Sequence, residues 1–375
     1  MTRSRHARPF HRSMIAAVAT MSCALVGASP AAAGFAPVAS PQGRSADRPE
    51  VGYWTGAGVE VSTATGRSVA TFPMFDNFSL QGSLLAGAFS SSAGGEFDLA
   101  ITGFALPTGR LLFTIPSGMN PTVLDERGRV AFWATFERDP QVNSVWLRER
   151  DGTIRRIVQF ANGPGLPGYD PGFGGDNTLL STSFDRRGRV LAVAQGNDVD
   201  LFAYDVFTVD VTTGRVTRHT ADHRSRWPAV SPNGRSVAYQ QEVGVCGGLD
   251  FVRAARLVVA RIDASRRRTI SGGSCGGWLH NPRWVSNSAL IAYRTVTAST
   301  AQFRTDLVLV DVPTGRQRLL TRTGDVFFFS VDPHRHLVAY QGDEVGFTVQ
   351  NLLTGRLAEV PHGRIPHLSG DHTFI

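Results

Sequence analysis

Lysine is absent from this 375-residue chain, so all 38 basic side chains are arginines, set against 31 acidic ones. The resulting isoelectric point is high, which ordinarily suggests nucleic acid as a partner. Here the arginine-only composition accounts for most of it. The densest basic run, residues 266–268, falls at an expected hairpin on an outer strand, where solvated charge is the simpler interpretation. We expect no nucleic-acid partner.

Helical periodicity is also missing, since no stretch of helical length places apolar residues at the spacing of a helix face. Residues 207–214 and 307–315 instead alternate apolar and polar side chains and are rich in β-branched residues. This pattern is typical of half-buried strands. We predict an all-β protein with few helices.

The amino terminus carries a basic segment, a largely apolar run at residues 14–28, and then three alanines at residues 31–33. This order is that of a secretory signal peptide, and the run is too short for a comfortable membrane span. An uncleaved anchor and lipidation at Cys23 stay open as alternatives. We expect residues 1–33 to be removed, residues 34–50 to form a disordered spacer rich in Pro, Ala and Ser, and residues 51–375 to form one domain. The mature chain would be extracytoplasmic in a bacterium, without a stable membrane span.

Cysteine is scarce, with three in the chain and two, Cys246 and Cys275, beyond the expected signal peptide. An even number in an exported protein favours a disulfide. Two buried free thiols are the alternative. Both residues are expected in connections on one face of the same repeat unit.

A turn followed by a strand with a small residue at a fixed place recurs along the chain. The copies cover residues 82–87, 128–132, 188–193, 231–239, 286–293 and 332–340, with alanines at Ala86, Ala131, Ala192, Ala238, Ala292 and Ala339. The steps between these alanines are 45, 61, 46, 54 and 47 residues. Short strands repeated at this period are typical of a β-propeller, whose blades each hold four antiparallel strands, A innermost to D outermost. The alanine fits strand B, where neighbouring blades pack closely near the narrow centre.

Turns of Thr-Gly-Arg type alternate with these cassettes and predict the hairpins between strands C and D. They lie at residues 65–67, 108–110, 213–215, 314–316 and 354–356, and residues 151–153 and 264–266 fill two gaps. Glycine supplies the positive φ that a tight hairpin needs. Seven such turns give about 46 residues per blade, near the usual ~40–45. We therefore predict seven blades, with six as the alternative.

The order of the hairpins also predicts how the ring closes. The ordered chain begins with a C–D pair at residues 58–72 and ends with a degenerate A–B pair at residues 364–375. Neither half-blade buries its edges alone. We expect the two to pair into one composite blade, so that deletion of residues 366–375 gives unfolded or aggregated protein.

The best-preserved cassette carries a family resemblance. Residues 231–239, with Trp227-Pro228-Ala229-Val230 before them, resemble the "PxWSPDGxxIAF" cassette of TolB-like, WD-repeat-like propeller domains. Residues 125–132, 185–193 and 332–340 resemble degraded copies, and residues 319–321 resemble the "xLT" that ends strand D in that family. The resemblance implies a propeller over residues 51–375, a module that occurs alone in exported proteins, in envelope complexes and beside serine peptidase domains. It consists of turn and core residues and does not indicate a ligand.

Binding is expected on the face where the B–C and D–A loops emerge, because long loops on a rigid scaffold commonly carry it. The predicted loops are residues 159–178, 195–204, 241–254, 272–281 and 295–305. Polar residues that start the inner strands should ring the channel mouth there: Asp76, Asn120, Asn177, Arg226, Asn281, Asp325 and Arg364. Three interpretations stay open: a funnel for a small polar ligand or peptide, a Ca²⁺ site formed by the aspartates and the asparagine oxygens, and a water-filled channel.

Three aromatic residues, Tyr169, Trp227 and Trp278, lie on or beside the same face. They are suited to stack on a sugar ring or on a partner's aromatic side chain, or to cap the core. Residues 272–276 match the G-x-S-x-G pattern of serine hydrolases, but outside the strand–turn–helix context that the motif needs. No histidine spacing indicates a metal site and no carboxylate pair indicates acid–base chemistry.

These observations together predict an exported, monomeric, non-enzymatic propeller. It would bind a protein or a cell-wall polymer at the cell envelope through its long-loop face. The alternative is an enzyme, a glycan or peptide hydrolase or lyase, that acts at the channel mouth through Asp76, Arg226 or Asp325.

Overall fold

A computed structural model describes residues 38–39, 50–91, 98–116, 118–134, 142–161, 177–197, 204–246, 249–273, 277–298, 303–342 and 345–374. All of them belong to the compact unit Ala36–Ile375. They form strands and turns, and within these ranges there is no helix, hence none that could cross a membrane. The expected signal peptide and most of the expected spacer lie outside the described residues.

The first half of the chain contributes fourteen strands. They are β1 (Val38–Ala39), β2 (Val51–Thr55), β3 (Gly58–Ser62), β4 (Ser68–Phe72), β5 (Asn77–Gln81), β6 (Leu84–Ser91), β7 (Asp98–Ala105), β8 (Arg110–Pro116), β9 (Met119–Val123), β10 (Val130–Ala134), β11 (Val142–Arg148), β12 (Ile154–Ala161), β13 (Asn177–Phe184) and β14 (Val190–Asn197).

The second half contributes sixteen more. They are β15 (Tyr204–Asp210), β16 (Val216–Arg218), β17 (Ser225–Val230), β18 (Ser236–Cys246), β19 (Leu249–Arg261), β20 (Arg267–Thr269), β21 (Leu279–Trp284), β22 (Ala289–Ala298), β23 (Phe303–Asp311), β24 (Gln317–Leu319), β25 (Phe328–Asp332), β26 (Leu337–Gln341), β27 (Phe347–Asn351), β28 (Leu357–Val360), β29 (Arg364–Leu368) and β30 (Thr373–Phe374).

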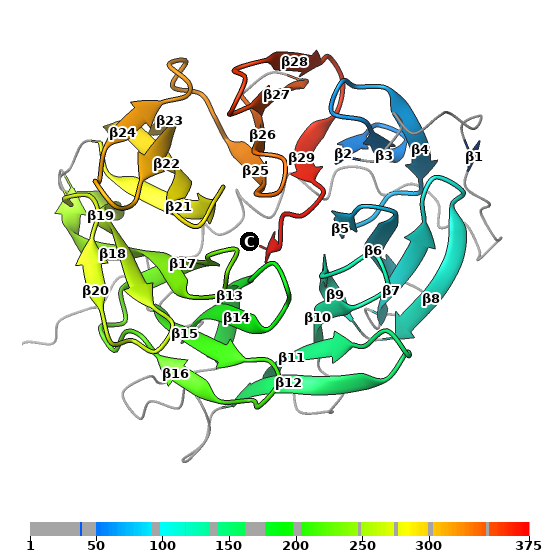
Figure 1. Ribbon diagram of the computed structural model, residues 1–375, viewed down its shortest axis with the longest axis horizontal. Coiled ribbons are helices and arrows are strands. Elements are labelled where there is room, and N and C mark those ends of the chain that lie inside the picture. Colours follow the sequence, from blue (N-terminus) through cyan, green and yellow to red (C-terminus); the bar gives the residue numbers. More distant parts are fainter. Residues whose placement is uncertain are drawn as a thin grey trace, which may run out of the picture. The chain divides into compact units, whose positions relative to one another are not determined.

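These strands form seven sheets around a common centre (Figure 1). Blade 1 is β29-β2-β3-β4, with β1 added outside, and blades 2 to 7 are β5–β8, β9–β12, β13–β16, β17–β20, β21–β24 and β25–β28. Neighbouring strands pair antiparallel throughout. The prediction of a seven-bladed propeller with four antiparallel strands per blade is confirmed.

Closure of the ring by the two ends of the chain is also confirmed, but the strands divide differently from the expectation. The amino-terminal segment supplies three strands of blade 1 (β2, β3 and β4), and the carboxy-terminal segment supplies only the innermost, β29. In register, Val51 lies opposite Leu368 and Gly52 opposite His367. Strand β2 does not match the cassette, because Gly52 stands where other B strands have alanine. A Cβ there would lie 2.5 Å from the Phe78 ring, so the position needs glycine.

The segment after β29, residues 369–374, forms a C-terminal tail that enters the centre of the ring (Figure 1). It bonds to blade 2, where Gly82 N–H donates to Ser369 Oγ at 2.8 Å. On blade 4, Phe184 N–H donates to the His372 carbonyl at 3.1 Å, and β30 pairs with β13. These partners lie where inner strands lead into A–B hairpins. The tail therefore lies across that end of the centre, instead of completing a B strand as expected.

The alanines of the cassettes are 0–1% exposed, which confirms their expected place between blades. Ala131, for example, packs with Phe184 and Leu191 of the next blade. Three serines of the inner strands also link neighbouring blades, because the Oγ of each accepts a hydrogen bond from a backbone N–H of the following blade. The pairs are Ser79 with Val123 (3.0 Å), Ser183 with Val230 (3.1 Å) and Ser330 with Leu368 (2.9 Å).

Two of the predicted long loops are mostly strand. Residues 241–254 continue β18 and β19 as a long hairpin, paired as far as Cys246 opposite Leu249, and residues 295–305 likewise extend β22 and β23. The disulfide stays a prediction, because Cys275 and the side chain of Cys246 lie outside the described residues.

Candidate functional site

The ring has two faces of different construction. The turn face carries the A–B and C–D hairpins, and the loop face carries the B–C and D–A connections and the starts of the inner strands. Most of the predicted site residues lie at these starts. Asp76 directly precedes β5, Arg226 is the second residue of β17 and Arg364 is the first of β29.

The other predicted channel residues follow the same rule. Asn120 lies in β9 and Asn281 in β21. Asp325 precedes β25, and its backbone forms an isolated parallel β-bridge with that of Thr305. Asn177 begins β13, although its side chain is outside the described part of the chain, and Tyr169 lies outside it altogether. Asp76 and Arg364 are exposed, and the other described members are half-buried.

Four inner strands share a backbone feature at this end. Each carries a residue of positive φ directly before a proline: Asn120 (53°), Trp227 (55°), Asn281 (49°) and Ile365 (52°). The strand register shifts at all four positions. Proline has no N–H for the ladder, so a bulge here leaves no donor unpaired. A left-handed backbone is unfavourable for tryptophan and isoleucine, and strained residues of this kind concentrate at functional sites.

Polar groups in the wall are paired with one another. Arg226 forms an ion pair with Glu242, whose side chain is 2% exposed. The positive charge of Arg226 is therefore balanced by a buried carboxylate of the same blade. Asn77 and Asn120, from neighbouring blades, exchange two hydrogen bonds. Asn77 Nδ2 donates to Asn120 Oδ1 at 2.8 Å, and Asn120 N–H donates to Asn77 Oδ1 at 3.2 Å.

Two histidines of the inner strands are packing groups. Burial lowers the pKa of His367 to about 4, and its ring lies 4.9 Å from that of Phe78. Burial, with the nearby positive charge of Arg226, lowers the pKa of His280 to about 3, and its ring stacks on Tyr293 at 5.1 Å. Both imidazoles are therefore neutral at neutral pH.

Phe327 and Phe328, at the start of β25, are 50% and 44% exposed. They are the only aromatic side chains among the exposed large hydrophobic residues of the described chain. Hydrogen bonds fix the segment, since Phe327 N–H donates to the Gln341 carbonyl at 2.9 Å and Tyr293 Oη donates to the Phe327 carbonyl at 2.6 Å. The sequence signal for this exposure was the run of three phenylalanines, residues 327–329, at and just before the start of β25, because side chains that alternate between two faces cannot all be buried.

The Trp278 side chain lies in the core, which is the second of the two interpretations given for it above. It is 3% exposed and packs with Ala254, Ala255 and Val243, so its ring belongs to a small core cluster. Trp227 is half-buried at its bulge. Of the two predicted aromatics within the described residues, Trp227 is the one that is partly exposed, and it lies in the inner strand β17.

No protein-family model matches the chain. No curated protein matches it either. Among solved structures, the tricorn protease matches with a TM-score of 0.59 and 11% identity, over 89% of this chain and 36% of that one. The propeller domain of the Trilobed protease from Pyrococcus furiosus matches with a TM-score of 0.58 and 10% identity, over 77% and 85% of the two chains. TolB from Acinetobacter baumannii matches at 0.47 and 14%, over 76% and 66%.

The chain is a β-propeller. Sequence identities this low show the fold alone, and the chain spans only about a third of the tricorn protease. Function must therefore be argued from the propeller's own surface. Within its described residues, no group of three or more His, Cys, Asp or Glu side chains is placed to hold a metal ion. Calcium at the channel mouth stays an untested alternative.

Proposed function

We propose that this propeller is exported and binds a protein partner at the cell envelope through its loop face, with Phe327 and Phe328 as the apolar anchor. Export is supported by the basic, apolar and small-residue order of residues 1–33. Partner binding is supported by one observation, the two neighbouring phenylalanines that hydrogen bonds hold exposed on this face.

Aromatic side chains provide large contact area at low entropy cost, and they dominate protein interfaces. Covering the exposed half of both rings would remove roughly 150–250 Å² from water, a gross gain of about 4–6 kcal/mol. Met74 and Val345, 53% and 57% exposed on the same face, extend the apolar area. Exposed Arg364 supplies a polar group of the kind found at interface rims.

Replacing both phenylalanines should abolish capture of the partner without unfolding the propeller. We expect Phe327→Ser/Phe328→Ser to recover at least tenfold less of the partner than the wild type, because two central aromatic anchors are lost. The measurement is quantitative pull-down from envelope and culture-fluid fractions, with partner identity by mass spectrometry and fold by circular dichroism. The same fractionation tests export. If the protein is exported, we expect it in the extracytoplasmic fractions, with Gly34 at its amino terminus.

The matched control is Leu353→Ser/Leu357→Ser. These two side chains are 73% and 60% exposed in the same blade, at its C–D turn and outer strand, away from the loop face. The control should retain the partner. Equal loss in both variants, or full retention by the phenylalanine variant, would refute the loop-face assignment. Recovery of the native protein only from the cytoplasm would refute export.

A further inference from the structure

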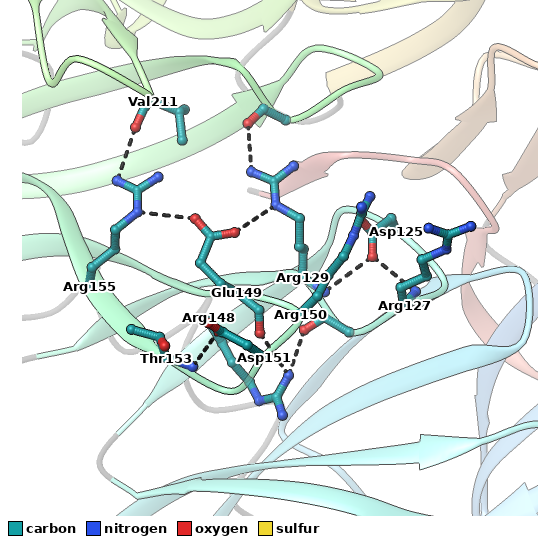
Figure 2. Close-up of polar contacts among 12 residues, drawn as sticks. Asp125, Arg127, Arg129, Arg148, Glu149, Arg150, Asp151, Thr153, Arg155 and Val211 are labelled. Atoms are coloured by element: carbon teal, nitrogen blue, oxygen red, sulfur yellow. Dashed lines mark hydrogen bonds and ion pairs between the residues drawn. The ribbon is translucent and has the colours of Figure 1, made fainter.

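Arginines on the turn face fasten one blade to the next (Figure 2). The Glu149 carboxylate lies between two guanidiniums and accepts from Arg129 Nε and Arg155 Nε, both at 3.1 Å. Each arginine then reaches blade 4. Arg129 Nη1 donates to the Arg187 carbonyl at 3.0 Å, and Arg155 Nη1 donates to the Val211 carbonyl at 3.0 Å. Arginines with a structural role on this face are thus matched by carboxylates or carbonyls.

A recess next to this network is lined by four arginines, and the side chains of three of them lack a hydrogen-bond or ion-pair partner among the described residues. Its volume is about 570 Å³, and its lining is Arg186, Arg187, Arg189, Pro232, Asn233, Arg235 and Asn287, from the A–B hairpins of blades 4, 5 and 6. Arg189 Nε lies 3.7 Å from the Asp185 carboxylate. The side chains of Arg186, Arg187 and Arg235 are exposed and, within the described residues, have no hydrogen bond or ion pair.

The hairpins that carry these arginines are fixed. Asp185 Oδ1 accepts the backbone N–H groups of Arg189 (2.6 Å) and Val190 (2.8 Å). The same hairpin is held from blade 3 by Arg129. Asn233 N–H donates to Asn287 Oδ1 at 3.0 Å, which ties blade 5 to blade 6. The guanidiniums therefore project from a preorganised frame, and a ligand need not order the backbone to engage them.

We propose that this recess binds an acidic polysaccharide. Among the described residues, four guanidiniums face one neighbouring carboxylate, so the recess has an excess of positive charge. Planar guanidiniums suit bidentate contacts with oxyanions. The four arginines come from two blades, 4 and 5, so their positive charges are spread along the recess. A polymer with repeated negative charges can contact both groups at once, whereas a single small anion cannot. Asn233 and Asn287 add amide groups that can bond sugar hydroxyls. Among the described residues, no aromatic side chain lines the recess, so this lining lacks the stacking platform that single-stranded nucleic acids use.

The test is binding of defined oligosaccharides to the mature protein. A mannuronic acid hexamer and a heparin hexasaccharide serve as acidic probes, maltohexaose as the neutral control, and single-stranded DNA of twelve nucleotides as the competing class. We expect at least one acidic probe to bind, more weakly in 300 mM than in 50 mM NaCl, and maltohexaose not to bind. Arg187→Gln/Arg235→Gln should weaken that binding about tenfold, since two charge-assisted contacts are lost.

The matched control is Arg318→Gln/Arg356→Gln. It removes the same charge from exposed arginines of blades 6 and 7 and should leave the affinity unchanged. Three results would overturn the proposal: no binding of either acidic probe, tighter binding of the DNA, or the same loss in both variants. The third would show that net charge, and not the recess, is responsible.

Discussion

Deletion of residues 366–375 is expected to leave protein that cannot close its ring and that aggregates. It removes Leu368 and His367, which pair with Val51 and Gly52 of β2. Val51 and Tyr53, now 0% and 1% exposed, would lose their cover. An unpaired inner edge beside an uncovered apolar cluster favours association with other chains. Size-exclusion chromatography and far-ultraviolet circular dichroism of the refolded protein measure the result.

A shorter deletion, of residues 369–375, separates closure of the ring from the contribution of the tail. It retains β29, so the protein should remain folded and monodisperse. Its thermal midpoint should fall by roughly 5–10 °C, because contacts with several blades and the partner of a buried arginine are lost. If the longer deletion melted at the temperature of the full chain, closure through β29 would be wrong.

The repeated elements of the fold could be predicted from the sequence because each depends on local chemistry. A hairpin needs its glycine or a residue that tolerates positive φ: Gly66, Gly214 and Gly315 adopt φ of 83°, 71° and 75°, and Ala264 takes the equivalent place at 57°. The buried alanines repeat because space between blades near the centre is limited. Seven blades follow from counting these elements.

The features that escaped prediction depend on contacts between residues far apart in the chain. The C-terminal tail has no periodicity, and its partners in β13 lie about 190 residues away in sequence. Gly52 breaks the alanine pattern because of the Phe78 ring in the neighbouring blade. The bulges at Asn120 and Asn281 could not be predicted either, because a bulge is a shift in the register between paired strands and is visible only once the strands are paired.

The candidate sites divide in the same way. The starts of the inner strands were predictable, because a repeat fixes which end of a strand faces which side. Whether a side chain there is free was not predictable: Arg226 is matched by Glu242, whereas Phe327 is exposed. The unmatched arginines of the turn face, such as Arg187, look the same in sequence as the matched Arg129.

Replacing one tail residue, Asp371, should destabilise the propeller nearly as much as removing the tail. Its Oδ2 accepts from the guanidinium of Arg283, from Ser330 Oγ at 2.6 Å and from Val331 N–H at 3.1 Å. The side chains of Arg283 and Asp371 are 9% and 2% exposed. Asp371→Ala would leave a buried guanidinium without its counter-charge, which typically costs about 3–5 kcal/mol.

A double-mutant cycle separates this penalty from a general loss of packing. Arg283→Met/Asp371→Ala removes both charges, and the unbranched methionine can occupy the space beside the Phe329 ring, over which the guanidinium now lies at 5.0 Å. We expect the double variant to regain most of the stability that Asp371→Ala loses, because no isolated charge remains buried. Chemical denaturation of the four proteins gives the coupling free energy. A cost below about 1 kcal/mol for Asp371→Ala, within the range of exposed pairs, would show that the pair does not hold the tail in place.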